Sequence, residues 1–266
     1  MKRLIVFLMI LAIMSYPMHG FAEEKEKQEK GFEIPNSVLN ISKDNTYTNP
    51  TQDLPHLQPN ELARELIDST DVTIENPDLI RILNESTINY TKLAFGFRAA
   101  IYLGEWPLSY RSDSTEVNWE YQKVNTNYVD NRGGRDVHKL SYFQEQQKKV
   151  AGGLTAKLPN SEAVEKMMMI KAAEHTNLPL AFETVIGQGT RKSQTYNVAP
   201  RQLGYLHSYV PAAKEKGVVT YGEVYLTFKG GKRELEVKNV TQQGTGAWIP
   251  VQDHLSYTFI AANQPR

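Results

Sequence analysis

The sequence of 266 residues contains no cysteine. This absence excludes a disulfide framework and thiolate chemistry, and it also excludes a lipid anchor, which would need a cysteine at the cleavage site of an export signal. The stability of the fold must therefore come from buried apolar side chains, and a chain of this length buries enough surface for that.

The chain also has no net formal charge. The chain carries 30 basic and 30 acidic residues. Without its first 22 residues it carries 28 basic and 30 acidic ones, because Lys2 and Arg3 fall in that stretch. The remaining formal charge of about −2 produces no overall field that would attract nucleic acid or an anionic membrane surface. The composition therefore predicts no nucleic-acid partner.

A long apolar run occurs only at the start of the chain. Lys2 and Arg3 precede the apolar stretch Leu4–Met14, and a polar segment then ends in Gly20-Phe21-Ala22. A basic start, a short apolar core and small residues at the positions that a signal peptidase recognises are typical of a secretory signal. The sequence predicts a signal peptide over residues 1–22, cleaved between Ala22 and Glu23.

This apolar stretch is shorter than the roughly 20 apolar residues that a membrane-spanning helix needs. Extended to Phe21 it would cover a thin membrane, so an uncleaved N-terminal anchor is the alternative. No later segment has the character of a transmembrane run, and no integral span is expected after removal of the signal. The predicted location is therefore secreted or associated with the cell envelope.

The spacings of known catalytic and metal sites are also absent. The sequence has no Gly-x-Ser-x-Gly, Ser-x-x-Lys or His-Glu-x-x-His, and neither a P-loop nor an EF-hand loop. Its six histidines are scattered, with no pair one helical turn apart that would hold a metal ion. The sequence thus predicts no catalytic residue, no metal site and no cofactor.

The chain after the signal divides by composition. Residues 23–31 carry many charges and no apolar side chain, which predicts a solvated tether. Residues 32–58 contain three prolines, which exclude a long helix, and seven Phe, Ile, Leu or Val residues, which a free linker would not need. We expect this segment to be an extended arm on the folded body. Residues 59–266 are expected to form a single domain, or two helix-then-sheet halves, 59–158 and 159–266.

Hydrophobic periodicity predicts an α+β fold. Apolar stripes indicate two short N-terminal helices, near residues 59–67 and 76–83, and one long helix over about 161–175. Alternation of period two indicates strands over residues 93–103, 117–121, 138–150, 154–158, 180–186, 193–198, 203–210, 218–228, 232–240 and 255–261. The predicted fold is a largely antiparallel β-sheet, curled or in two layers, with the long helix packed on it.

The clearest local prediction is a hairpin at Gly230-Gly231, because a two-residue turn of this kind needs positive φ angles. This turn places Leu226 opposite Leu235 and Val224 opposite Val237. Polar residues alternate with these on the other face of both strands, so the register is strongly specified.

Binding residues are predicted at several positions. Arg132 and Arg135 form a basic patch with glycines between them that suits a phosphate group, although solvated loop charges give the same pattern. Trp119 and Trp248 are candidate stacking platforms for sugars, whereas aromatic residues at strand spacing more often belong to the core. His254 follows an aspartate as a candidate acid–base pair, but neighbouring strand residues point to opposite faces.

Several longer segments are specific enough to resemble a known family. They are Ile34–Lys43, Asn49–Pro55, Asn118–Lys123, Asp130–Gly134, Lys166–Leu180 and Gly246–His254. These segments resemble the YfkD-like family of Bacillus-type bacteria, and the resemblance extends over nearly the whole chain from about Gly31. It implies an exported protein of a Gram-positive envelope without an assigned activity, so no residue role is carried over.

These features predict a non-enzymatic protein of the cell envelope that binds a wall polymer, a peptide or another envelope protein. The alternative is a hydrolase of envelope polymers whose catalytic residues come together only in the folded chain. A deep cleft with two carboxylates, or an aspartate and a histidine, within about 5 Å would favour the hydrolase. A shallow aromatic or basic groove would favour binding.

The predicted export signal has a direct test. Because cleavage follows the small residue Ala22, N-terminal sequencing of protein from the culture medium or the cell-wall fraction should begin at Glu23. Detection only as a full-length species in the membrane fraction would contradict the prediction and favour the uncleaved anchor.

Overall fold

The computed structural model describes residues 32–50, 58–86, 98–230 and 232–264. The predicted signal peptide and charged tether lie outside these residues, as do part of the arm, the start of the predicted strand 93–103 and Gly231. Gly31–Arg266 forms one compact unit. Within the described part of the chain, no helix is both long enough and apolar enough to cross a membrane.

The fold is broadly α+β, a mostly antiparallel β-structure with three helices among the described residues. The helices are α2 (Glu61–Ile67), α3 (Pro77–Glu85) and α4 (Ser161–Thr176). The strands are β1 (Val38–Asn40), β2 (Arg98–Asp130), β3 (His138–Phe143), β4 (Lys148–Ala151), β5 (Gly153–Leu154), β6 (Glu183–Ile186), β7 (Arg191–Val198), β8 (Leu203–Lys229), β9 (Lys232–Pro250) and β10 (His254–Ala262).

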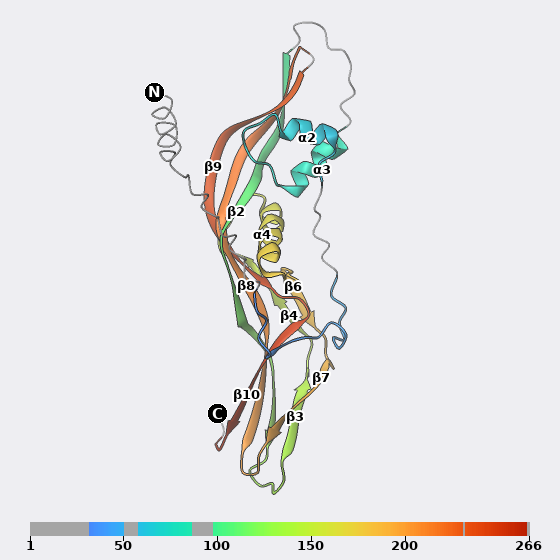
Figure 1. Ribbon diagram of the computed structural model, residues 1–266, viewed down its shortest axis with the longest axis vertical. Coiled ribbons are helices and arrows are strands. Elements are labelled where there is room, and N and C mark those ends of the chain that lie inside the picture. Colours follow the sequence, from blue (N-terminus) through green and yellow to red (C-terminus); the bar gives the residue numbers. More distant parts are fainter. Residues whose placement is uncertain (1–31, 51–57, 87–97, 231, 265–266) are drawn as a thin grey trace, which may run out of the picture. The chain divides into compact units, whose positions relative to one another are not determined.

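The main sheet has six strands, and its three longest are β2, β8 and β9, with β8 at the centre (Figure 1). β2 pairs with β8 from Arg98 opposite Lys229 to Asp130 opposite Leu203. The other edge of β8 pairs with β9 and then with β10, which continues where β9 ends. We call β2, β8 and the β9–β10 edge the ribbon. β5 pairs with β9 and β1 with β10, while β3–β7 and β4–β6 form two separate two-stranded sheets.

The long strands are longer than the sequence predicted, because the breaks in the apolar pattern are bulges and not chain reversals. β2 and β8 slip in register at five places, one of them directly after Pro107. Pro107 has no N–H to donate, which an outer strand at a bulge tolerates. Pro211 lies in β8 where the partner changes from β10, paired up to Tyr209, to β9, paired from Ala212. Pro211 has no N–H, and at this position its absence interrupts neither the β8–β10 nor the β8–β9 hydrogen-bond ladder.

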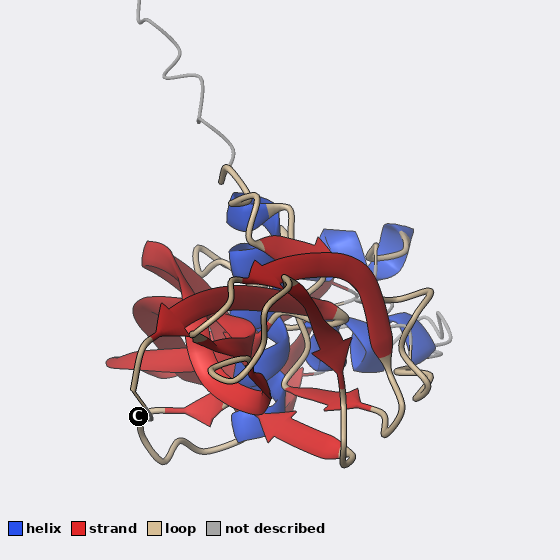
Figure 2. Ribbon diagram, turned by 90° about the horizontal axis from the view of Figure 1, so that it is seen from below, coloured by secondary structure: helices blue, strands red, loops and turns tan. Residues whose placement is uncertain are grey.

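One face of the ribbon is covered in three sections, each with its own apolar cluster. Figures 1 and 2 show the long strands curving around the helices. α2 and α3 cover Leu108, Val224, Leu226 and Leu235, α4 covers Val219, Tyr221, Ala247 and Ile249, and the two small sheets with Ile41 cover Leu206, Val210 and Leu255. The ribbon thus has a covered face and an opposite face, and the helices and small sheets pack on the covered one.

The start of α3 joins this helix to β2. Asn76 is completely buried and acts as the N-cap of α3. Its side-chain oxygen accepts hydrogen bonds from Asp78 N at 2.9 Å and Leu79 N at 3.3 Å. Its Nδ2 donates to the backbone oxygen of Pro107 at 2.7 Å, so one side chain both caps the helix and holds it to the ribbon.

The hairpin between β8 and β9 has the predicted register. Val224 lies opposite Val237 and Leu226 opposite Leu235. Gly230 has a φ of 57°, a left-handed conformation that glycine adopts without strain. Apolar alternation on both strands was therefore sufficient to determine which residues pair.

The described part of the N-terminal arm is attached by backbone pairing and by one carboxylate. β1 pairs with β10, and Ile41 next to it is completely buried. Asp253 Oδ1 accepts hydrogen bonds from Asn45 Nδ2 at 2.9 Å and from Asn49 Nδ2 at 2.7 Å. The arm is thus bound at both ends of a stretch of about ten residues, next to the turn between β9 and β10.

Candidate binding surface

The face of the ribbon opposite the core carries a row of aromatic side chains. In the first part of β8, Leu206, Ser208 and Val210 are buried, so the residues between them point the other way. Tyr205, His207 and Tyr209 are these residues, and each is partly exposed. Tyr128 of β2 lies opposite Tyr205 in the register and is 67% exposed.

These four rings follow one another at nearly constant spacing. Ring centroids are 6.3 Å apart for Tyr128 and Tyr205, 6.4 Å for Tyr205 and His207, and 6.4 Å for His207 and Tyr209. The first two pairs are nearly parallel, with interplanar angles of 27° and 19°. We call Tyr128, Tyr205, His207 and Tyr209 the aromatic file. Within it, the His207 and Tyr209 rings meet edge to face at 72°, so three nearly parallel rings are followed by one that is turned.

A cation stands near each end of the aromatic file. At one end, Lys123 Nζ lies 5.6 Å from the centre of the Tyr209 ring, a cation–π contact. At the other end, Arg132 lies in the exposed loop that follows β2, four residues after Tyr128. Arg132 is itself bound in two places by Asp130, at 3.0 Å through Nε and 2.7 Å through the terminal nitrogen. These hydrogen bonds lower the pKa of the Asp130 carboxyl to about 2.

Among the residues predicted from the sequence, Arg132 is the one that the structure places at the aromatic file. Arg135 lies in the same exposed loop. Trp119 packs against the apolar cluster beneath α4. Trp248 is half-buried, and its ring stacks on Tyr121 with centroids 5.1 Å apart.

His254 is buried, with 8% of its surface exposed. Its Nδ1 lies 2.8 Å from the backbone oxygen of Gln252, and its Nε2 lies 3.5 Å from the side-chain nitrogen of Asn40. The adjacent carboxylate of Asp253 is occupied by the arm. The two side chains therefore hold the turn and the arm in place.

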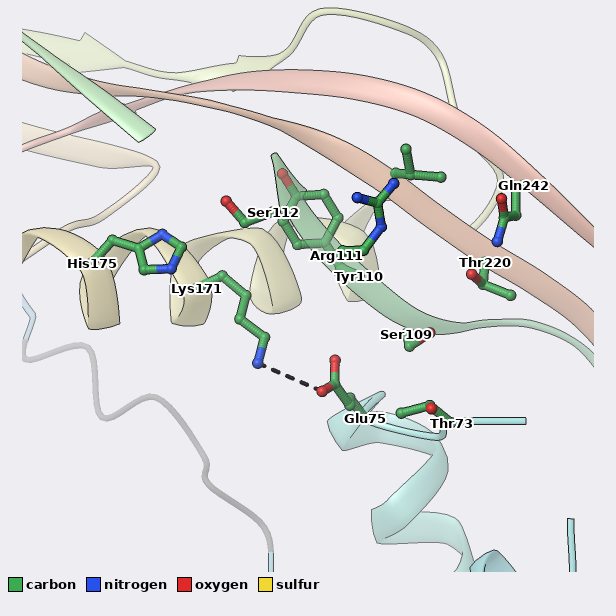
Figure 3. A pocket seen from close by; sticks show the side chains of 11 residues that line it. Thr73, Glu75, Ser109, Tyr110, Arg111, Ser112, Lys171, His175, Thr220 and Gln242 are labelled. Carbon is green, nitrogen blue, oxygen red and sulfur yellow. Dashed lines mark ion pairs between the residues drawn. The ribbon is translucent and has the colours of Figure 1, made fainter. Parts of the chain in front are cut away.

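A groove beside α4 brings together polar residues of β2 and α4 (Figure 3). It has a volume of about 420 Å³. β2 contributes Arg111 and Ser112, and α4 contributes Lys171 and His175, which lie one turn apart along the helix. Lys171 Nζ forms an ion pair at 3.5 Å with Glu75, which precedes α3. The groove is thus polar and nearly balanced in charge.

Behind the groove, a completely buried carboxylate links three elements. Glu215 of β8 accepts hydrogen bonds from Tyr110 OH at 2.9 Å and from Thr115 Oγ1 at 2.6 Å. Thr115 Oγ1 also lies 2.8 Å from His175 Nδ1. Because the hydrogen of this hydroxyl goes to Glu215, His175 Nδ1 is the donor to Thr115. The chain of bonds fixes the last turn of α4 against β2 and β8, and Glu215 has no surface with which to contact a ligand.

Metal ligands do not cluster in the part of the chain that the structure describes. Across residues 32–50, 58–86, 98–230 and 232–264, no three His, Asp or Glu side chains gather in a way that could hold a metal ion.

The aromatic file was missed at the sequence level although a signal was present. The segment Tyr205–Tyr209 alternates aromatic side chains with residues of the core, and such alternation places all three rings on the uncovered face. Tyr128 carries no comparable signal, because its position next to Tyr205 depends on how β2 slips past β8 at the bulges.

The fold and these surfaces define a mostly antiparallel β-protein with an aromatic row on one face. Comparison with known proteins gives its family. The chain matches the YfkD-like protein family over residues 35–266. It is 61% identical over 238 residues to "Uncharacterized protein YfkD" of Bacillus subtilis (strain 168), a match covering 90% of each chain. The chain therefore belongs to the YfkD-like family, as the resemblance predicted.

Removal of the Tyr110 hydroxyl tests the role of the buried carboxylate. In Tyr110→Phe, Glu215 loses one of its two donors, and an unpaired buried acceptor costs about 1–3 kcal/mol in the free energy of unfolding at neutral pH. Burial, with smaller contributions from Glu215, raises the pKa of Tyr110 above its usual value. The folded state therefore holds this proton when the unfolded state has lost it, and stability falls as pH rises above about 10.

Denaturant unfolding at neutral pH and at several alkaline pH values measures both effects. In Tyr110→Phe, the free energy of unfolding should decrease less steeply with pH in the alkaline range. The difference in slope should be up to about 1.4 kcal/mol per pH unit, the largest contribution that one titrating tyrosine can make. Tyr142→Phe is the matched control, because burial also raises the pKa of Tyr142 while its hydroxyl donates to neutral Gln144. A Tyr110→Phe protein with the parent's stability and alkaline slope would contradict this role of Glu215.

Proposed function

We propose that this chain is an exported protein of the cell envelope that binds an extended wall polymer along the aromatic file. The observation that carries the proposal is the row of four partly exposed rings at 6.3–6.4 Å spacing on the uncovered face of the ribbon. The signal-like N-terminus supports export, since a basic start and a short apolar core precede small residues at the expected cleavage site.

Regular spacing favours a polymer over a compact ligand. Three of the rings come from alternate residues of one strand, so their repeat is set by the backbone and follows a straight line. A sugar ring presents C–H groups that pack on the negative face of an aromatic ring, and a specific aromatic contact contributes about 0.5–1.5 kcal/mol beyond the area it buries. Successive units of one chain can therefore add such contacts along the aromatic file.

Stacking, more than charge, would supply the affinity. Arg132 is already paired with Asp130, and both side chains are exposed, so their net attraction for a charged ligand is small. Lys123 remains as a local cation beside Tyr209. Salt screens exposed charges beyond roughly 8–10 Å at physiological strength, and binding should accordingly weaken in moderate salt without disappearing.

The groove beside α4 favours the hydrolase alternative less. Glu75 is the carboxylate that lines it, and it pairs with Lys171. The carboxylate that orients His175 is Glu215, which is completely buried and cannot reach a substrate. General acid–base hydrolysis needs groups within hydrogen-bond reach of the reacting atoms. The exposed rings of the aromatic file therefore support polymer binding better than the groove supports hydrolysis.

Loss of two rings tests the proposed binding. The parent should sediment with isolated cell walls, and Tyr205→Ala/Tyr209→Ala should bind about 5- to 100-fold more weakly, because two aromatic contacts are removed. The matched control is Tyr47→Ala, which removes a tyrosine that is 39% exposed but lies on the arm. It should sediment like the parent.

The measurement is the bound fraction at low and at moderate salt, with the thermal unfolding of each variant followed in parallel. Failure of the parent to sediment under either condition would refute wall binding. Equal binding by the parent and the double variant would show that the aromatic file is not the contact surface.

A further inference from the structure

A second feature of the uncovered face lies where β8 pairs with the end of β9. A hollow of about 370 Å³ opens there, within the range of roughly 300–1,000 Å³ typical of ligand sites. Its side chains include Lys214, Lys216 and Trp248, and its floor includes Gly244 and Gly246. We call this set of five residues the lysine hollow. It belongs neither to the aromatic file nor to the groove beside α4.

Gly244 creates the open space, whereas Gly246 is buried and has Thr155 and Lys216 close to it. Gly244 lies opposite Val218 and Gly246 opposite Lys216, so two successive positions on this face of β9 carry no side chain. A Cβ atom added at Gly244 would meet nothing within 4 Å, which shows that open space lies above it. Any other residue at this position would reach into the hollow without displacing a neighbour.

Trp248 forms a fixed wall of the hollow. Its neighbours in the chain, Ala247 and Ile249, are buried in the core, which directs the indole to the uncovered face. Tyr121 stacks on it with an interplanar angle of 21°. Lys214 Nζ lies 5.6 Å from the centre of the indole ring. The ring is thus held between two neighbours next to the open floor.

Two lysines, Lys214 and Lys216, line the hollow, and the two carboxylates that also line it, Asp113 and Glu215, are bound by other protein groups. Lys214 Nζ is 4.0 Å from Glu116 Oε2, a long contact to a side chain that is 71% exposed, and such a pair contributes little. Lys216 is exposed and has no ion pair within the described residues. The nearby carboxylate of Asp113 is bound by Arg111 at 2.7 Å. Two ammonium groups therefore remain for a ligand.

We propose that the lysine hollow is a subsite for a sugar unit that carries an anionic group, a phosphate or a carboxylate. The sugar ring packs beside the Trp248 indole, above the bare backbone of Gly244. Lys214 and Lys216 donate charge-assisted hydrogen bonds to the anion. The proposal deepens the proposed function and rests on it, because it makes the polymer that follows the ribbon an anionic one.

Three soluble probes test this assignment: phosphorylated dextran, polygalacturonate and unmodified dextran. The quenching of tryptophan fluorescence follows binding, since Trp248 forms the wall of the site. The parent should bind at least one charged polymer at least about tenfold more tightly than unmodified dextran, as expected for charge-assisted hydrogen bonds. Comparison of the two charged probes shows whether phosphate or carboxylate is preferred.

Two variants distinguish binding in the lysine hollow from nonspecific electrostatic attraction of the charged polymers. Lys214→Gln/Lys216→Gln should lose the preference for the charged probe. Gly244→Val should weaken binding about tenfold or more without changing any charge, because its side chain fills the hollow while β-branched residues suit a strand. The matched charge control is Lys229→Gln/Lys232→Gln, at the far end of the same two strands, which should bind like the parent.

Either of two results would overturn the proposal: equal affinity of the parent for dextran and both charged polymers, or full affinity in Gly244→Val. The same titrations on Tyr205→Ala/Tyr209→Ala separate the two proposals. If that variant keeps its affinity for the charged probe while the parent does not sediment with walls, the lysine hollow stands and the proposed wall binding fails.

Discussion

The pairing of β8 on both of its edges is the constraint on which the rest of the structure depends. β2 follows one edge of β8 over its whole length, and β9 and β10 share the other edge. A strand in this position has its backbone N–H and C=O groups satisfied from both sides, so only its side chains remain to interact. Because alternate side chains point to opposite faces, one central strand determines both what is buried and what is displayed.

The two faces of the ribbon carry different residues of the same strands: the covered face carries the core, and the opposite face carries the residues of the proposed binding surface. α2, α3, α4 and the small sheets bury Val219, Leu206 and their neighbours on one face. Tyr205, His207 and Tyr209 follow the same alternation to the other face, as do Lys214 and Lys216 beyond Pro211. The buried positions shift by one residue across Pro211, from Ser208 and Val210 to Ala213 and Glu215, so Lys214 lies between buried neighbours as His207 and Tyr209 do. Buried Glu215 belongs to the first group, since its hydrogen bonds connect β8 to β2 and α4.

Local sequence signals predicted the parts of the fold that local chemistry determines. Asn76 before Pro77, the hairpin at Gly230 and the alternation from Val224 to Leu235 each involve neighbours in the chain, and each was predictable. The length of β2 was not, because proline and polar interruptions look like strand ends until a partner strand absorbs them as bulges. The aromatic file and the lysine hollow depend on registers between residues some 30 to 80 positions apart. Arg132 and Trp248 were identified as binding candidates, but their neighbours at these surfaces follow from pairing that one sequence does not reveal.

Hydrogen exchange along β8 tests the central claim most directly. If β8 is held on both edges as one unit, its interior amides before and after Pro211 should exchange only through global unfolding, with the same free energy and the same dependence on denaturant. The amides at the two ends of the strand should exchange faster through fraying. Exchange of residues 204–210 at a much lower free energy than residues 212–228 would contradict the account. It would mean that the part bearing the aromatic file opens independently of the part bearing the lysine hollow.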